Sequence, residues 1–247
     1  MSRDIPTGAK RIMVALDVDE LSAAVAIAEE LKGLGVTFKI GNQLGTYEGW
    51  QKAVEFARSY EAYIFCDTKF KDIPATVERS ARSITRHQPD MFNIMADNNL
   101  AALRAAVTGA ESAILDYDLP TRPAIIGVTV LTSISDEEAQ SIYGATAAEK
   151  VMQFAEMAAE AGLDGLVCSG QEVASLRSNP VTADLLLVVP GIRPAWAATG
   201  DQNRVMTPRE AIDAGADYLV IGRPITQPPS DIGSPRQAVE KILEELA

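Results

Sequence analysis

The sequence is poor in histidine and cysteine, the two residue types that most often supply metal ligands and nucleophiles. Its 247 residues include one histidine, His87, and two cysteines, Cys66 and Cys168. A single histidine excludes a histidine-rich metal site, and any serine-histidine or cysteine-histidine pair would have to use it. His87 stands at an expected helix end, where a solvated side chain is the default. Both cysteines fall inside apolar runs, which indicates buried thiols.

Positive charge is also scarce, and long apolar runs are missing. The chain has 22 Lys and Arg against 34 Asp and Glu, a formal net charge of −12. This balance disfavours nonspecific attraction to nucleic acid or to an anionic membrane, so an anionic substrate would need a local basic site. No run approaches about 18 apolar residues, and the first residues lack the apolar core of a signal peptide. We therefore expect a soluble, cytoplasmic protein.

Short apolar runs alternate with helical segments along the chain. Near-continuous apolar strands are typical of a parallel sheet covered by helices, and eight such units fit a chain of about 250 residues as an α/β TIM (β/α)8 barrel. We predict this fold as a single domain over residues 1–247. An open doubly wound sheet is the alternative, but no Gly-x-Gly-x-x-Gly turn follows the first strand.

The expected strands are 12–17, 37–41, 62–69, 91–96, 124–131, 165–169, 185–189 and 218–221. The expected helices include 20–32, 48–59, 76–86, 99–107 and 147–161. Thr207 and Ser234, each followed by proline, predict two further helix starts.

Charged residues gather at the carboxyl ends of the first three expected strands. Asp17 ends the first strand, Lys39 lies late in the second, and Asp67 and Lys69 end the third. Side chains two residues apart on a strand share a face, and TIM-barrel active sites form at the carboxyl ends of the strands. A solvated ion pair is the simpler reading, but an alternating array lets each ion stabilise the next. Asp72 must lie in the following turn, where it could instead cap the next helix.

A basic pair is expected on the far side of the same rim. Arg193 follows the seventh strand in Pro-Gly-Ile-Arg-Pro, and Gly222-Arg223-Pro follows the eighth. Loops at these two places commonly hold phosphate in TIM barrels, where glycine allows close backbone approach and arginine donates a forked pair of hydrogen bonds. Simple turns are the alternative. Residues 195–200, small and flexible, are a candidate lid.

Thr132 and Ser133 follow the fifth expected strand, between these two sides. Either residue could donate to a polar heterocycle, although Thr-Ser after a strand is often only a turn.

One long motif spans the end of the third strand and the turn after it. It reads Phe65-x-Asp67-x-Lys69-Phe70-x-Asp72-Ile73-Pro74-x-Thr76. Other motifs follow in order: Val128-Thr129-Val130-Leu131-Thr132-Ser133, Pro190-Gly191-Ile192-Arg193-Pro194, Gly200-Asp201-Gln202 and Met206-Thr207-Pro208. In order and spacing they resemble the orotidine 5′-monophosphate decarboxylase family, from Ala15-Leu16-Asp17 to Ile221-Gly222-Arg223-Pro224.

The resemblance implies decarboxylation of orotidine 5′-monophosphate to uridine 5′-monophosphate, the last step of de novo UMP synthesis, by a homodimer without cofactor or metal. Lys69 would protonate C6 of the pyrimidine, with Lys39, Asp67 and Asp72 completing the charged array. Asp72 and Thr76 would reach the neighbouring subunit's site. The resemblance implies these substrate-binding residues: Asp17, Lys39, Asp67, Ile73, Thr76, Thr132, Arg193, Gln202, Gly222 and Arg223.

Two stretches depart from the family pattern. Met95-Ala96-Asp97-Asn98-Asn99 stands where many relatives have His-Ala-x-Gly-Gly, and Ala75 stands where asparagine is frequent. These changes affect the geometry of local loops and leave every residue assigned to the chemistry in place.

Two other functions stay open. A related metal-dependent sugar-phosphate decarboxylase or aldolase branch shares Asp-x-Lys-x-x-Asp, but has an acidic residue where this chain has Lys39. An inert nucleotide-binding barrel is the second alternative, although binding alone would not require a strained set of charges.

Overall fold

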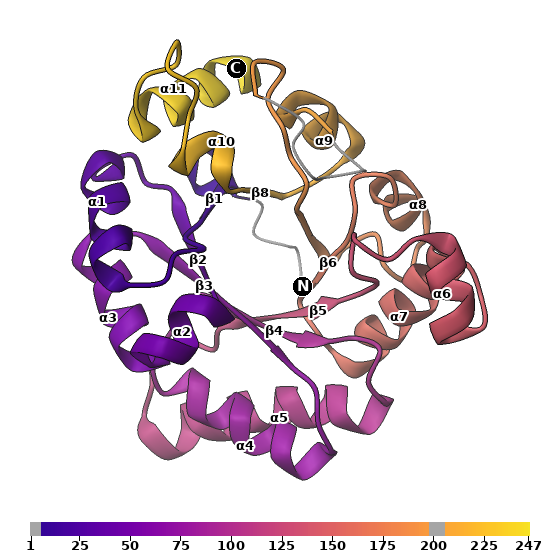
Figure 1. The fold of residues 1–247 in the computed structure, drawn as a ribbon. Helices are drawn as coiled ribbons and strands as arrows, with labels where there is room; N and C mark the ends of the chain where they lie inside the picture. The colour runs from indigo at the N-terminus through magenta and orange to yellow at the C-terminus, as the bar shows by residue number, and fades with distance from the viewer. Residues whose placement is uncertain (1–5, 198–205) are drawn as a thin grey trace.

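Eight parallel strands close into a barrel in the computed structural model, which describes residues 6–197 and 206–247 (Figure 1). Each strand pairs with the next along the chain, and β8 returns to pair with β1. This confirms the predicted TIM barrel. The strands are β1 (Ile12–Ala15), β2 (Thr37–Gly41), β3 (Tyr63–Phe70), β4 (Met91–Met95), β5 (Ala124–Val128), β6 (Gly165–Val167), β7 (Leu186–Val189) and β8 (Tyr218–Ile221).

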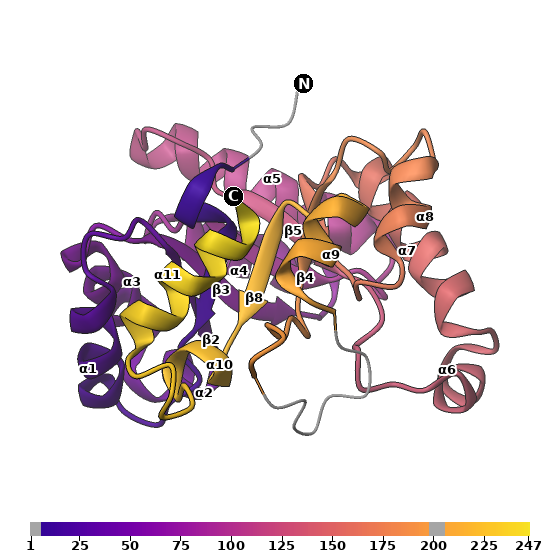
Figure 2. The same cartoon turned by 90° about the horizontal axis from the view of Figure 1, so that it is seen from above.

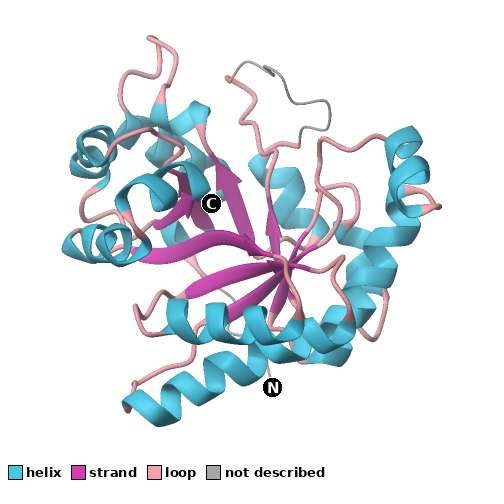
Figure 3. Cartoon of the chain, turned by 60° about the horizontal axis from the view of Figure 1, so that its bottom comes forward, coloured by secondary structure: helices cyan, strands magenta, loops and turns pink. Residues whose placement is uncertain are grey.

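Helices surround the barrel and cover the outer face of its strands (Figures 1, 2 and 3). They are η1 (Gly8–Arg11), α1 (Leu21–Leu31), α2 (Asn42–Glu48), α3 (Trp50–Ser59), α4 (Pro74–Thr85), α5 (Leu100–Tyr117), α6 (Asp136–Tyr143), α7 (Ala147–Ala161), α8 (Val173–Ser178), α9 (Pro208–Ala214), α10 (Arg223–Thr226) and α11 (Pro235–Leu246). No helix within residues 6–197 and 206–247 is long and apolar enough to cross a membrane.

The apolar core has two layers because successive strand side chains point to opposite faces. On β1, Ile12 and Val14 belong to the large layer between strands and helices, and Met13 belongs to a small cluster inside the barrel. Phe65 joins Met13 in that inner cluster. The inward rows of β2 and β3 continue from this apolar floor to Lys39 and Asp67, which places charged groups above it.

Several predicted boundaries were wrong. The third strand is an exception, since it runs to Phe70 and so has Asp67 and Lys69 at its end as predicted, with a register shift against β4 after Cys66. The fifth strand ends at Val128 and not at Leu131. The apolar residues Val130 and Leu131 line a cavity beyond the strand, and the prediction mistook them for strand residues. The helix expected over 99–107 runs to Tyr117.

Two helix starts that were predicted from single residues are confirmed. Thr207 and Ser234 are the N-caps of α9 and α11, each with a capping box and a proline in the first turn. Asp72 does not cap α4, since the N-cap residue is Ile73 and no side chain caps that helix. Capping therefore does not explain why an aspartate occupies position 72.

Helices α4 and α5 pack closely at Gly109. A Cβ atom built on Gly109 would collide with the backbone carbonyl of Glu78 on α4. Glycine is thus required at this crossing, and α4, which follows directly from the Asp72 turn, is held tightly against its neighbour.

Candidate active site

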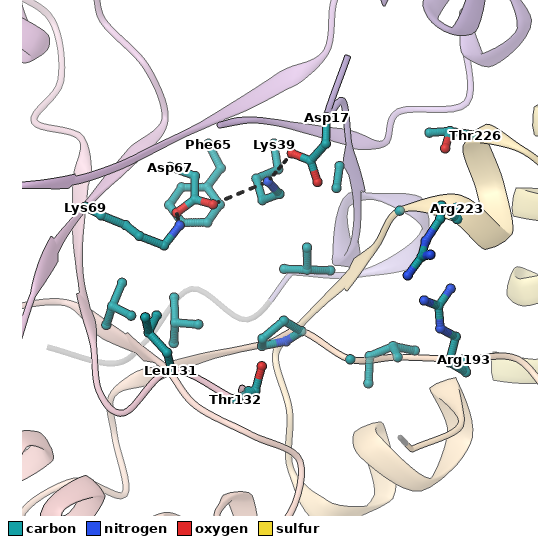
Figure 4. A pocket seen from close by; sticks show the side chains of 18 of the residues that line it. Asp17, Lys39, Phe65, Asp67, Lys69, Leu131, Thr132, Arg193, Arg223 and Thr226 are labelled. Atoms are coloured by element: carbon teal, nitrogen blue, oxygen red, sulfur yellow. Dashed lines mark hydrogen bonds and ion pairs between the residues drawn. The ribbon is translucent and has the colours of Figure 1, made fainter. Parts of the chain in front are cut away.

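A cavity of about 500 Å³ opens at the carboxyl ends of the barrel strands (Figure 4). Its floor includes Phe65, and its walls come from residues that end or follow most of the strands. Those used below are Asp17, Lys39, Asp67, Lys69, Leu131, Thr132, Arg193, Gly222 and Arg223. The predicted location of the site, at this end of the barrel, therefore coincides with a cavity.

Four charged side chains from β1 to β3 form a continuous ion-paired row on one wall (Figure 4). The Lys39 ammonium lies 2.9 Å from a carboxylate oxygen of Asp17 and 3.3 Å from Oδ2 of Asp67. The Lys69 ammonium lies 2.5 Å from the other Asp67 oxygen, Oδ1. The structure thus brings together the four residues that the sequence placed on one rim, with positive and negative groups alternating.

Burial varies along this row. The Lys39 side chain is 9% exposed and that of Asp67 is 13% exposed, whereas Asp17 is 57% exposed. Lys69 is 34% exposed, so its ammonium is held by Asp67 and still reaches the open cavity. Within this wall the Asp67–Lys39 pair is the buried part, and Asp17 and Lys69 are its accessible ends.

Mutual attraction keeps the buried pair ionised. Burial raises the pKa of Asp67, but the ammonium groups of Lys39 and Lys69 and the Asn93 amide lower it more, so the net direction is downward. Burial lowers the pKa of Lys39, but the carboxylates of Asp67 and Asp17 reverse this, and the net direction is upward. Each group therefore stabilises the charged form of the other.

Asn93 on β4 is a site residue that the sequence analysis missed. Its side chain is fully buried, and its Nδ2 donates to Oδ1 of Asp67 over 2.6 Å. Its Oδ1 accepts the backbone N–H of Lys69 over 2.6 Å. The only sequence signal is a polar residue between Phe92 and Ile94 in an otherwise apolar strand, which does not reveal its partners.

Two arginines occupy the opposite wall. Arg193 follows β7 and is buried, Arg223 begins α10 after β8, and their guanidinium groups point toward one another (Figure 4). Gly222 is the N-cap of α10 and also lines the cavity. The basic pair predicted from the loops after the seventh and eighth strands is thus present. Gln202 lies outside the described residues, as does part of the candidate lid at 195–200.

Thr132 lies on the cavity wall between the charged and basic sides, beside Leu131 (Figure 4). Its hydroxyl is available to a polar group of a ligand in the middle of the cavity. Ser133 is not among the described residues that line it.

The turn after β3 lies apart from the cavity. Asp72, Ile73 and Thr76 are not among the described residues that line it. Asp72 is exposed, and its Oδ1 accepts the backbone N–H of Ile73 over 2.7 Å. Ile73 is 65% exposed. In this chain alone, therefore, the turn presents a carboxylate and an apolar side chain to the outside.

The stretch that departs from the family pattern braces this turn. Asn98 donates from Nδ2 to the backbone carbonyl of Asp72 over 2.9 Å. Asp97 accepts from the Lys71 ammonium over 2.7 Å, so both residues after β4 hold the segment after β3. The changed loop sequence thus has partners in the neighbouring loop.

The remaining chemistry-bearing residues lie elsewhere or are inert. Cys66 and Cys168 are free and buried, as predicted, and burial raises the pKa of both thiols. His87 is half-buried beyond the end of α4, and burial lowers the pKa of its imidazole. Across the described residues, no group of three or more His, Cys, Asp or Glu side chains is arranged to hold a metal ion.

The chain is similar to known proteins over nearly its whole length. A family model described as "Orotidine 5'-phosphate decarboxylase / HUMPS family" matches residues 10–242. Two proteins named orotidine 5'-phosphate decarboxylase, from Idiomarina loihiensis and Gloeothece citriformis, are each 42% identical to this chain, over 240 and 239 residues. The match covers 96% of this chain and 97% of each relative.

Two solved structures have the same fold as this chain. The crystal structure of orotidine 5'-phosphate decarboxylase from Lactobacillus acidophilus matches with a TM-score of 0.80 and 30% identity, over 96% of this chain and 98% of that one. A structure of an uncharacterized conserved protein from Geobacillus kaustophilus matches with a TM-score of 0.79 and 28% identity, over 96% of this chain and all of that one. The similarity therefore includes both walls of the cavity.

Proposed function

Because the chain belongs to the orotidine 5′-phosphate decarboxylase / HUMPS family, we propose that it converts orotidine 5′-monophosphate to uridine 5′-monophosphate and carbon dioxide without a cofactor or metal. The observation that carries the proposal is the ion-paired row of Asp17, Lys39, Asp67 and Lys69 on one wall of the cavity. We also propose that the reaction takes place in the cytoplasm.

Lys69 supplies the proton. When the C6 carboxylate leaves as carbon dioxide, its bonding electron pair stays on C6, where the ring does not readily delocalise it. An ammonium beside C6 stabilises that pair and then transfers a proton to it, forming the new C–H bond. Lys69 becomes a neutral amine and is reprotonated from solvent. Its partial exposure to the cavity supports this role.

Asp67 acts on the substrate before the bond breaks. Its carboxylate is already ionised and fixed by Lys39 and Lys69. A substrate carboxylate placed beside it is repelled, and this repulsion disappears as carbon dioxide forms. Lys39 bridges Asp67 to Asp17, and the ribose hydroxyls are proposed to contact the exposed Asp17 and the buried Lys39 beside it.

The basic wall holds the phosphate. Arg193 and Arg223 offer forked cationic donors, and Gly222 allows a close approach of its backbone. Gln202 is assigned to the same phosphate side, although it lies outside the described residues. Thr132, between the two walls, is positioned to contact the pyrimidine. Binding energy from the distant phosphate can then be used at C6.

The Asp72 turn serves a second subunit. Asp72 and Ile73 are exposed on this chain and lie outside its cavity, and Thr76 follows in the first turn of α4. We propose that the protein is a homodimer in which Asp72, Ile73 and Thr76 reach the neighbouring site, completing its charged array.

Lys39 also favours the cofactor-free reaction over the metal-dependent branch. Its ammonium occupies the space between the carboxylates of Asp17 and Asp67, the two groups on this wall that would attract a divalent cation. A cation placed there would be repelled by Lys39 or would have to displace it.

The test is ultraviolet-monitored conversion of orotidine 5′-monophosphate by the purified protein, with and without a metal chelator. We expect loss of substrate and release of carbon dioxide at the same rate in both. Turnover of a sugar phosphate that the chelator stops would favour the metal-dependent branch. Tight binding of uridine 5′-monophosphate without turnover of either substrate would indicate an inert binding protein.

A further inference from the structure

The end of β3 is irregular at the residues that carry the charges. Lys69 has a positive φ of 49°, a left-handed backbone conformation that non-glycine residues rarely adopt and that costs free energy. Cys66 pairs with Phe92 and Phe70 pairs with Ile94, so β3 advances four residues while β4 advances two. The ladder therefore loses its regular backbone partners at residues 67–69.

Asn93 stands opposite this bulge and accepts hydrogen bonds from two of its residues. Its side-chain oxygen accepts the Lys69 N–H over 2.6 Å, and its backbone carbonyl accepts the Thr68 hydroxyl over 2.6 Å. The Thr68 hydroxyl bond is buried and the Lys69 N–H bond is partly buried, so the loss of either acceptor would leave a poorly solvated donor unsatisfied. Asn93 thus stabilises the strained backbone of Lys69.

The same amide orients the Asp67 carboxylate. A backbone N–H can only donate, so the Asn93 oxygen must face Lys69 and its NH2 group must face Asp67. Nδ2 lies 2.6 Å from Oδ1 of Asp67, the same oxygen that the Lys69 ammonium contacts over 2.5 Å. One buried side chain therefore fixes the backbone of one charged residue and the carboxylate of the other.

We propose that Asn93 is a positioning residue that holds the Lys69 ammonium and the Asp67 carboxylate in the relative position that the reaction requires. This proposal rests on the decarboxylase function proposed above. Asn93 does not line the described cavity and acts through its two neighbours. Small displacements of reacting groups reduce rates by about 10²-fold, so a residue that fixes both members of the pair should affect turnover more than binding.

The test uses steady-state kinetics of Asn93→Ala and Asn93→Asp across pH. For Asn93→Ala we expect kcat to fall about 10- to 100-fold with little change in KM. The acid limb of the plot of kcat against pH should shift to higher pH in this variant, because the Asp67 carboxylate loses a donor that lowers its pKa. Thr37→Val is the matched control, since Thr37 is also fully buried in a strand but donates only to the backbone carbonyl of Lys10.

Asn93→Asp is the more informative variant because the aspartate side chain has nearly the same shape as asparagine, whereas Asn93→Ala removes most of the side chain. At neutral pH the new carboxylate faces Asp67, and repulsion should lower kcat at least as far as in Asn93→Ala. On acidification the new carboxyl group takes up a proton and can again donate to Asp67 while accepting from Lys69, so kcat should recover relative to Asn93→Ala. A merely structural role predicts no such recovery.

Wild-type kcat and pH profile in both variants would overturn the proposal. A loss of activity that matches the loss of thermal stability seen in Thr37→Val, without a pH shift, would do so as well. If the wild-type protein does not turn over orotidine 5′-monophosphate, the proposed function fails separately. A carbon-13 NMR titration of the Asp67 carboxyl then decides: an upward pKa shift in Asn93→Ala upholds the positioning role, and an unchanged titration overturns it.

Discussion

Lys69 and Asp67 contact one another within a single strand, their charged atoms 2.5 Å apart and one residue between them in the chain. Regular strand geometry places such side chains on one face but does not bring their tips together. The positive φ of Lys69 and the bulge against β4 accompany this contact. The proposed proton donor is thus held by local backbone geometry as well as by charge.

Replacing Lys69 with alanine should lower kcat by at least about 10²–10⁴-fold, the range for loss of a positioned proton donor. Substrate binding, measured by calorimetry, should survive because the phosphate contacts remain. Lys52→Ala is the control, since Lys52 is exposed on α3 and pairs with Glu48 outside the cavity. Equal activity of Lys69→Ala and the wild type would contradict the role given to Lys69.

Replacing Arg223 with alanine should mainly raise KM, by about 10- to 100-fold. A change of this size corresponds to the loss of one or two charge-assisted hydrogen bonds. Arg223→Lys should give an intermediate KM because it keeps the charge but loses the forked donor. Initial-rate kinetics will measure both. Arg209→Ala serves as control, because Arg209 lies on α9 and donates to the backbone of Glu245. Unchanged KM and kcat in Arg223→Ala would remove this residue from the phosphate site.

Mixing two inactive variants tests whether Asp72 acts across a dimer. Lys69→Ala and Asp72→Ala homodimers are combined and allowed to exchange subunits. If Asp72 serves the partner, each mixed dimer contains one intact site, and random exchange restores about a quarter of all sites. If Asp72 acts within its own chain, no intact site forms and activity stays absent. The readout is the recovered kcat per site against unmixed controls.

Stability should depend on pH through the buried Lys39–Asp67 pair. The pKa of Asp67 is lowered on folding, so its contribution is present above the ordinary value of 3.8 and is lost as pH falls through the lower folded value. The pKa of Lys39 is raised, so its contribution is present below 10.5 and is lost as pH rises through the higher folded value.

Urea unfolding of the wild type and of Lys39→Met across this range will measure the effect. The difference in unfolding free energy should be greatest between pH 3.8 and 10.5 and should shrink beyond both limits. A difference that stays constant from acid to alkaline pH would show that the pair does not set the pH dependence.

Gly109→Ala should destabilise the fold by about 1–3 kcal/mol, because the added methyl group overpacks the crossing of α5 with the Glu78 carbonyl on α4. Thr108→Ala, at the exposed neighbouring position, should change the unfolding free energy by less than about 0.5 kcal/mol. Thermal unfolding of both variants measures this. Equal stability of the two variants would mean that the helices separate without cost.

The sequence predicts the barrel and the location of its charges because both follow from simple periodicity. Apolar runs mark the strands, and the last residues of each strand must lie on one rim, so Asp17, Lys39 and Asp67 could be placed together. The motif resemblance added the family, which the comparisons confirm.

The bulge and its partner could not be predicted from the sequence. Nothing in the residues around Lys69 signals a positive φ, since this conformation depends on the strand beside it. Asn93 appears only as one polar residue in an apolar strand, and its role becomes visible once β4 lies against β3. The roles of Asp72 and Thr76 stay predictions, because they concern a second subunit.

The two walls of the cavity come from separate parts of the chain. The charged row belongs to the first three strands, and the two arginines follow the last two. For directed evolution this separation means that substitutions around Arg193 and Arg223, the proposed phosphate site, can be made without changing Lys69, the proposed proton donor. New substrates with a different tail are therefore best sought by diversifying the final third of the sequence.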